Sequence, residues 1–167
     1  MSDAIYFYGH KNEYGFMSNF YPCVFKLNCT INGVKQSVSF NCSEQYFMFK
    51  KCMMFDENNT MLIHQILTED KPSKIKALGR QVVNFDGATW DQHKFKIMMK
   101  ALKYKFGQNE ELMMMLQMTR GKILYEASPK DKIWGIGMNA IKGIASDPST
   151  YGQNLLGQSL MIIRDGE

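Results

Sequence analysis

An acid and an amine stand seven residues apart in a segment that favours a helix. Glu44 and Lys51 lie in a run of helix-forming and aromatic residues that begins at Ser43. Seven residues make about two helical turns, or ~10 Å along the axis, so both side chains would share one face. Such a pair could contact different parts of one substrate. The helix dipole alone also explains an acid in a first turn, so a structural interpretation of Glu44 stays open.

A second group of candidate residues lies in an irregular segment further along the chain. Residues 126–137 contain a proline and the closely spaced Gly135 and Gly137, which do not allow a long helix or strand. In this segment Asp131 supplies a carboxylate and Trp134 a large aromatic plane. This combination suggests a site that binds a flat or sugar-like ligand. A tight turn with a core tryptophan explains the same residues, and the spacing does not decide between the two.

Three further polar residues have both a structural and a binding interpretation. Asn19 lies in a loop before the first long predicted strand, where its amide can close the loop or face a ligand. Arg80 follows a predicted helix stop at Gly79 and can either cap that helix or hold a phosphate. Asn154 is a suitable N-cap for the last predicted helix, which explains it adequately without a ligand.

The charge of the chain is moderately basic. The net charge of +4 suits an anionic ligand such as a nucleotide but does not require one. Lys96, Lys100 and Lys103 would form a basic face on one predicted helix, which we interpret as a solvated surface with phosphate binding as the alternative. A general nucleic-acid-binding protein usually carries a stronger and more clustered excess of positive charge.

Histidines and cysteines do not form a metal-binding pattern. The three histidines are scattered, and the four cysteines show no CxxC spacing. We therefore expect no metal and no redox cofactor, and reduced thiols in a cytoplasmic protein. No run of 18 apolar residues occurs, so we expect no membrane partner.

The hydrophobic pattern predicts a mainly helical α+β fold, compact and with one domain over residues 1–167. Asn32-Gly33 between two strand-like runs is a strong hairpin signal. The predicted strands are 4–8, 24–31, 34–40 and 123–126, and the predicted helices are 43–54, a segment from the cap Asp56 to about 67, 72–79, a segment that ends at Gly107, a segment after Asn109, and 154–164.

Several short motifs, in order, resemble the YbiA-like, or NADAR, N-glycosidase family. The resemblance covers nearly the whole chain, from about Tyr6 to Arg164, and its most specific part is residues 124–137. The motifs are Gly-Phe-x-Ser-Asn-Phe-Tyr-Pro at 15–22, Ser-Glu-Gln-Tyr at 43–46 with Lys51, Ala-Leu-Gly-Arg at 77–80, Trp90 ahead of Met-Met-Lys-Ala-Leu at 98–102, Lys-Phe at 105–106, Leu-x-Glu-Ala-Ser-Pro-x-Asp-x-Ile-Trp-Gly-Ile-Gly at 124–137, Asn-Leu-Leu-Gly at 154–157 and Leu-Met-x-x-Arg at 160–164.

The resemblance implies a compact, mostly helical domain with a few short antiparallel strands that cleaves N-glycosidic bonds. One branch of the family hydrolyses phosphorylated intermediates of riboflavin synthesis, and another removes ADP-ribose from guanine in nucleic acid. The implied partners are thus an ADP-ribose-containing or phosphoribosyl substrate, or ADP-ribosylated DNA or RNA, without an obligate protein partner. The implied catalytic residues are Glu44, Lys51 and Asp131, and the implied substrate-binding residues are Asn19, Phe20, Arg80, Trp90, Trp134, Gly135, Gly137 and Asn154.

The chemistry of a ribosyl C–N bond gives each implied catalytic residue a role. Cleavage builds positive charge on the sugar, which a carboxylate stabilises. Glu44 would act on water or on sugar hydroxyls, and Asp131 would be the partner carboxylate. Lys51 would protonate the leaving group or form an imine with the opened sugar. Trp90 or Trp134 could stack on the base. The alternative function is a module that binds ADP-ribose or NAD without cleaving it.

The chain departs from the family pattern in three places. They are Met48-Phe49-Lys50 in the helix after Glu44, Thr119-Arg120-Gly121 before the late strand, and an insertion from Ile141 to Tyr151. These departures concern the choice of substrate more than the class of reaction. Arg120 and Lys122 favour a larger anionic substrate, and equal turnover of an ADP-ribosyl-guanine substrate by Arg120→Ala would contradict that hypothesis.

Overall fold

The computed structural model describes residues 3–166, which form two compact units. The terminal unit combines Met1–Tyr21 with Glu110–Glu167, and the central unit is Pro22–Asn109. The predicted domain spans residues 1–167, of which residues 1, 2 and 167 lie outside the described residues. That the chain forms one domain stays a prediction.

The central unit begins with the predicted β-hairpin. Strands β2 (Phe25–Ile31) and β3 (Val34–Phe40) pair antiparallel, with Phe25 opposite Phe40. The turn residues Asn32 and Gly33 have φ values of 50° and 77°. Asparagine and glycine tolerate this left-handed conformation better than other residues. The Asn32-Gly33 pair alone therefore predicts the hairpin correctly.

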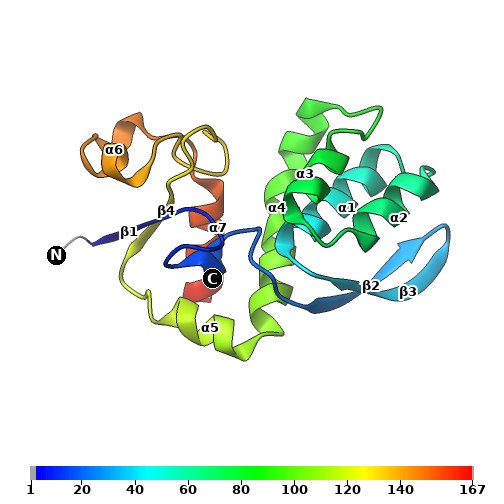
Figure 1. Ribbon diagram of the computed structural model, residues 1–167, viewed down its shortest axis with the longest axis horizontal. Helices are drawn as coiled ribbons and strands as arrows, with labels where there is room; N and C mark the ends of the chain where they lie inside the picture. The colour runs from blue at the N-terminus through cyan, green and yellow to red at the C-terminus, as the bar shows by residue number, and fades with distance from the viewer. Residues whose placement is uncertain (1–2, 167) are drawn as a thin grey trace. The chain divides into compact units, whose positions relative to one another are not determined.

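Four helices complete the central unit (Figure 1). Helix α1 (Ser43–Phe55) packs against α2 (Thr60–Thr68), α3 (Pro72–Gly79), α4 (Gly87–Gly107) and β3. Its first seven residues are all buried, so α1 forms the core of this unit. A Cβ atom at Gly79 would lie 1.9 Å from the Sδ atom of Met48, which explains the glycine at that position of α3.

One predicted helix cap is at the wrong residue, and a second makes no capping hydrogen bond. Asn59, not Asp56, is the N-cap of α2, and its side chain accepts a hydrogen bond from the N–H of Leu62. The Asp56 carboxylate instead accepts from the side-chain amide of Asn59 at 2.9 Å, so it supports the cap from outside the helix. Asn154 is the N-cap residue of α7 (Leu155–Asp165), as predicted, but its side chain makes no capping hydrogen bond to that helix.

The terminal unit contains a parallel pair of strands. Strand β1 (Ala4–Phe7) pairs with β4 (Ile123–Glu126) in parallel, which corrects the expectation of antiparallel strands only. A parallel pair requires a long crossover, and the whole central unit lies between these strands in the sequence. Helix α7 packs against β4 and against α5 (Glu110–Gln117).

Arg164, from the last motif, holds α7 in place. Its side chain is 5% exposed and donates to the carbonyl oxygens of Thr119 at 3.0 Å and Lys122 at 2.7 Å. It also pairs with Asp165 at 2.8 Å. This motif residue therefore has a structural role at the turn before β4.

The insertion 141–151 has a short helix that the sequence did not reveal, α6 (Ala140–Ile144), and a 3-10 helix, Pro148–Thr150. Tyr151 anchors this segment, because its hydroxyl donates to the carbonyl oxygen of Gly143 at 2.6 Å and lies 2.8 Å from the hydroxyl of Tyr6.

The prediction of a mainly helical α+β fold is confirmed. Among residues 3–166, no helix has the length and apolar character needed to cross a membrane.

Candidate functional site

The central unit brings three of the predicted polar residues into one electrostatic cluster. Glu44 lies in the first turn of α1 and is only 7% exposed. Lys51 is half-buried two turns further on, and Arg80 directly follows α3. Burial lowers the pKa of Lys51, with the Glu44 carboxylate opposing this effect and the Arg80 guanidinium adding to it. The predicted shared face of Glu44 and Lys51 thus fits the structure.

The polar residues around Glu44 fix the start of α1. The Gln45 side chain accepts from the N–H of Asn41 at 2.8 Å and donates to the carbonyl oxygen of Ile66 at 2.9 Å. Cys42 is the N-cap residue of α1, and its side chain makes no capping hydrogen bond. The carboxylate of Glu44 is therefore held by a helix that is anchored through its neighbour Gln45.

The ring of Phe85 lies against the Lys51 amine. Its Nζ atom lies 4.6 Å from the ring centroid of Phe85, whose side chain is 46% exposed. Trp90 is buried and packs with ring centroids 4.9 Å from Phe47 and 6.2 Å from Phe55. We therefore interpret Trp90 as a support, while Phe85 offers the accessible ring. Phe85 belongs to none of the sequence motifs, so no sequence signal singled it out.

In the terminal unit, Asp131 shapes the loop that carries Trp134. Its Oδ1 atom accepts hydrogen bonds from the N–H groups of Ile133 and Trp134, both at 2.9 Å. This geometry supports the tight-turn interpretation. It leaves the negative charge of Asp131 at a half-buried position beside the half-buried Trp134, so a chemical role stays a prediction.

Both predicted glycines of this loop have steric reasons. A Cβ atom at Gly135 would lie 2.8 Å from the carbonyl oxygen of Glu126. Gly137 has a φ of +75°, and a Cβ atom there would lie 2.6 Å from the Cγ atom of Lys132. These contacts explain the Trp-Gly-Ile-Gly sequence through the fold of the loop, and substrate binding by the glycines stays a prediction.

The side-chain amide of Asn154 binds the main chain of β4. Its Oδ1 atom accepts from the N–H of Glu126 at 3.0 Å, and its Nδ2 atom donates to the carbonyl oxygen of Leu124 at 2.9 Å. Both ends of the amide thus bind β4, and the side chain is 6% exposed. This geometry supports the structural interpretation of Asn154, and its binding role stays a prediction.

Asn19 and Phe20 follow the 3-10 helix Gly15–Met17 and are both half-buried. The N–H of Phe20 donates to the Oγ atom of Ser18 at 3.2 Å, and the ring centroid of Phe20 lies 6.1 Å from that of His10.

The predicted site residues fall into two groups. Glu44, Lys51, Arg80 and Trp90 lie in the central unit, and the other seven lie in the terminal unit.

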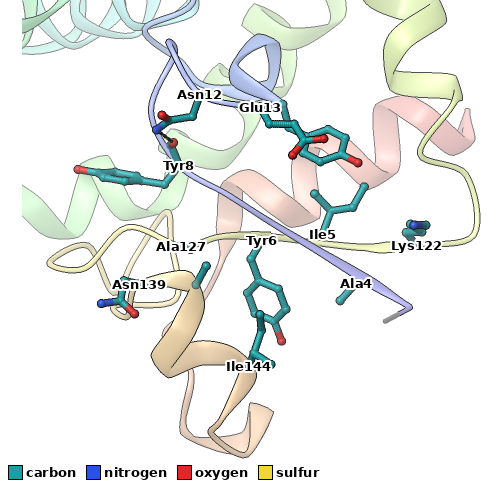
Figure 2. A pocket seen from close by; sticks show the side chains of 12 residues that line it. Ala4, Ile5, Tyr6, Tyr8, Asn12, Glu13, Lys122, Ala127, Asn139 and Ile144 are labelled. Atoms are coloured by element: carbon teal, nitrogen blue, oxygen red, sulfur yellow. Dashed lines mark hydrogen bonds between the residues drawn. The ribbon is translucent and has the colours of Figure 1, made fainter. Parts of the chain in front are cut away.

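A separate hollow of about 700 Å³ lies in the terminal unit. Figure 2 shows Tyr6 and Ile5 of β1, Tyr8 and Asn12 of the following loop, and Lys122 among its lining residues. The side chain of Asn12 donates to the carbonyl oxygen of Tyr8 at 2.7 Å. None of the predicted site residues lines this hollow, so we do not assign the reaction to it.

The fold and the motifs can now be compared with known proteins. The NMR structure of the Escherichia coli protein YbiA matches with a TM-score of 0.73 at 28% identity, over 99% of this chain and 86% of that chain. The fold is therefore of the YbiA class. A family model, the NADAR domain, matches residues 6–166, and the chain belongs to this family.

Two relatives carry informative names. A protein named as an N-glycosidase from Acanthamoeba polyphaga mimivirus is 39% identical over 96% of this chain and 94% of its own length. A protein named as a riboflavin biosynthesis protein from Vibrio vulnificus is 29% identical over 99% of this chain, which spans 39% of that protein.

Proposed function

We propose that this protein is an N-glycosidase that hydrolyses a ribosyl C–N bond. The observation that carries the proposal is the buried carboxylate of Glu44 acting electrostatically on the Lys51 amine, whose pKa is lowered by burial. Perturbed ionisable groups of this kind are typical of catalytic sites. The family membership and the name of the mimivirus relative support the same class of reaction.

The charged cluster suits the requirements of this reaction. The Glu44 carboxylate can orient water or a sugar hydroxyl and stabilise the positive charge that develops on the ribose. A lowered pKa brings the Lys51 amine closer to the range in which it can exchange a proton or attack an aldehyde. Arg80 is exposed and can bind a phosphate of the substrate.

The substrate that we propose first is ADP-ribosylated guanine in nucleic acid, because the chain is moderately basic and Arg120 and Lys122 are exposed. The name of the Vibrio vulnificus relative supports phosphorylated riboflavin-pathway intermediates as the second substrate class. Both contain a ribosyl–nitrogen bond, so the same charged cluster serves either substrate.

The test is to incubate the protein with an ADP-ribosyl-guanine oligonucleotide and with a phosphoribosyl-aminopyrimidine, and to follow the free base by mass spectrometry. Release from the oligonucleotide is the expected result. Release from the aminopyrimidine alone would move the substrate to the riboflavin branch. Binding of ADP-ribose without release from either substrate would replace the hydrolase with a binding module.

A further inference from the structure

A second, smaller pocket lies in the central unit. It has a volume of about 250 Å³ and is lined by β2, α1 and the Lys100 region of α4. We call it the β2 pocket. Its apolar lining residues include Leu27, Tyr46 and Phe49, while Lys50 and Lys100 supply its charges. None of the described residues that line the pocket is acidic.

The β2 pocket is distinct from the proposed catalytic cluster. Tyr46, Phe49, Lys50 and Met53 line it and lie three, four or seven residues apart, so they share one face of α1. At ~100° per residue, Glu44 and Lys51 lie about half a turn around the helix axis from this face. A ligand in the β2 pocket would therefore occupy the opposite side of α1.

Both lysines of the β2 pocket act electrostatically on the thiol of Cys29. Lys50 and Lys100 both favour the thiolate of Cys29, although burial has the larger effect and raises the pKa of this thiol. Cys29 is half-buried and lines the pocket with them. Cys29 therefore marks a position in the pocket that feels two positive charges.

The free edge of β2 adds hydrogen-bond donors. The N–H of Lys26 donates to the side chain of Gln108, and its carbonyl oxygen accepts from the same amide, both at 2.8 Å. The main-chain groups of Lys26 therefore point away from β3, and alternation along the strand points those of Asn28 and Thr30 in the same direction. Both residues line the pocket, and within residues 3–166 their N–H groups have no hydrogen-bond acceptor.

We propose that the β2 pocket binds a small phosphorylated anion, a phosphomonoester that carries a single sugar ring. Two cations and free N–H donors match the charge and acceptors of a phosphate. The apolar lining residues can contact the carbon part of the ligand, and the pocket volume lies just below the ~300 Å³ at which pockets for drug-sized ligands begin. The proposal does not depend on the proposed N-glycosidase activity.

Alkylation of Cys29 tests the proposal without any turnover. Iodoacetamide modification of Cys29 would be followed by peptide mass spectrometry, with ribose 5-phosphate or unphosphorylated ribose present. We expect ribose 5-phosphate to slow the modification, because the anion covers the thiol and offsets the lysines that favour its thiolate. Ribose should have no effect. Equal rates with and without ribose 5-phosphate would overturn the proposal.

Matched variants test whether the two lysines of the β2 pocket hold the anion. Lys50→Met and Lys100→Met should each weaken the half-maximal protection of Cys29 by about tenfold, the effect of one charged hydrogen bond. Lys96→Met, on the same helix as Lys100 but outside the pocket, should leave it unchanged. Protection that persists equally in Lys50→Met and Lys100→Met would contradict the proposed site.

Discussion

At the scale of single residues, the Lys51 amine has the clearest chemical signature. Burial lowers its pKa, and Glu44 and Arg80 act on it with opposite signs. Phe85 lies beneath the amine, at 4.6 Å from Nζ to the ring centroid. Burial and Arg80 ease deprotonation of the amine, whereas Glu44 and the Phe85 ring favour its charged form. A lowered pKa is useful to a group that transfers a proton or forms an imine.

Replacement of Lys51 by methionine should lower kcat by about 100-fold or more, the usual contribution of a general acid or base. Lys51→Arg keeps the positive charge but cannot release its proton at moderate pH, so it should be impaired to a similar extent. Steady-state kinetics on the base-release reaction would measure both variants. An effect on KM alone, or full activity of Lys51→Arg, would assign Lys51 to binding.

Asp131 requires a variant that separates charge from geometry. Asp131→Asn keeps an oxygen acceptor for the N–H groups of Ile133 and Trp134 but removes the negative charge. If the carboxylate stabilises the sugar, this variant should lose about 100-fold in kcat with little change in melting temperature. Asp131→Ala should lose both activity and stability. Normal turnover by Asp131→Asn would leave Asp131 with a structural role only.

At the scale of elements, Asn154 connects the start of α7 to β4. Its amide satisfies one N–H and one carbonyl group of β4, and its φ of 53° places it in the left-handed region. A change here affects two elements together, because α7 and β4 pack directly against each other.

Asn154→Leu should lower the free energy of unfolding by roughly 2–4 kcal/mol, because two buried main-chain groups lose their partners and leucine is strained at positive φ. Asn154→Gly relieves the strain but not the lost hydrogen bonds, so it should be intermediate. Urea unfolding would measure both, with the exposed neighbour Gln153→Leu as the control. A loss below about 0.5 kcal/mol for Asn154→Leu would show that the amide does not hold β4.

The elements that depend on local sequence could be predicted well. The hairpin follows from Asn32-Gly33, and the end of α3 and its first-turn proline follow from single residues. The parallel pairing of β1 with β4 could not be predicted, because these strands are short and far apart in the sequence. Helix α6 has five residues, too few for a hydrophobic period to appear.

The candidate site was only partly predictable for a similar reason. The helical period placed Glu44 and Lys51 on one face, which requires knowledge of α1 alone. Phe85 reaches the Lys51 amine from the segment between α3 and α4, and no spacing rule relates these residues. For Asp131 and Asn154 the sequence left two interpretations, because the same polar side chains can bind a ligand or the main chain.

At the scale of the whole molecule, the buried Lys105 makes stability depend on pH. Its side chain is fully buried, and burial lowers its pKa from 10.5 to about 8, with Cys23 and Cys42 opposing the shift. Between these pKa values the unfolded chain binds more protons than the folded chain. The contribution of Lys105 to stability must therefore rise with pH from about 8 to 10.5.

Comparison with Lys105→Met isolates this effect. Below pH 8 the wild type carries the cost of a buried charge, and from pH 8 to 10 its unfolding free energy should rise relative to Lys105→Met by roughly 2–3 kcal/mol. Urea unfolding at several pH values would measure the difference. The exposed Lys103→Met should show a constant difference from wild type. A constant difference for Lys105→Met as well would contradict the buried-charge account.

The reaction itself is tested most directly by Glu44→Gln, which keeps the shape of the side chain and removes its charge. We would measure kcat for base release by mass spectrometry and substrate affinity by calorimetry, with the exposed Glu57→Gln as the matched control. The account predicts that Glu44→Gln binds substrate and stays folded but loses about 100-fold or more in kcat, while Glu57→Gln is unaffected. A folded Glu44→Gln variant with wild-type turnover would contradict it.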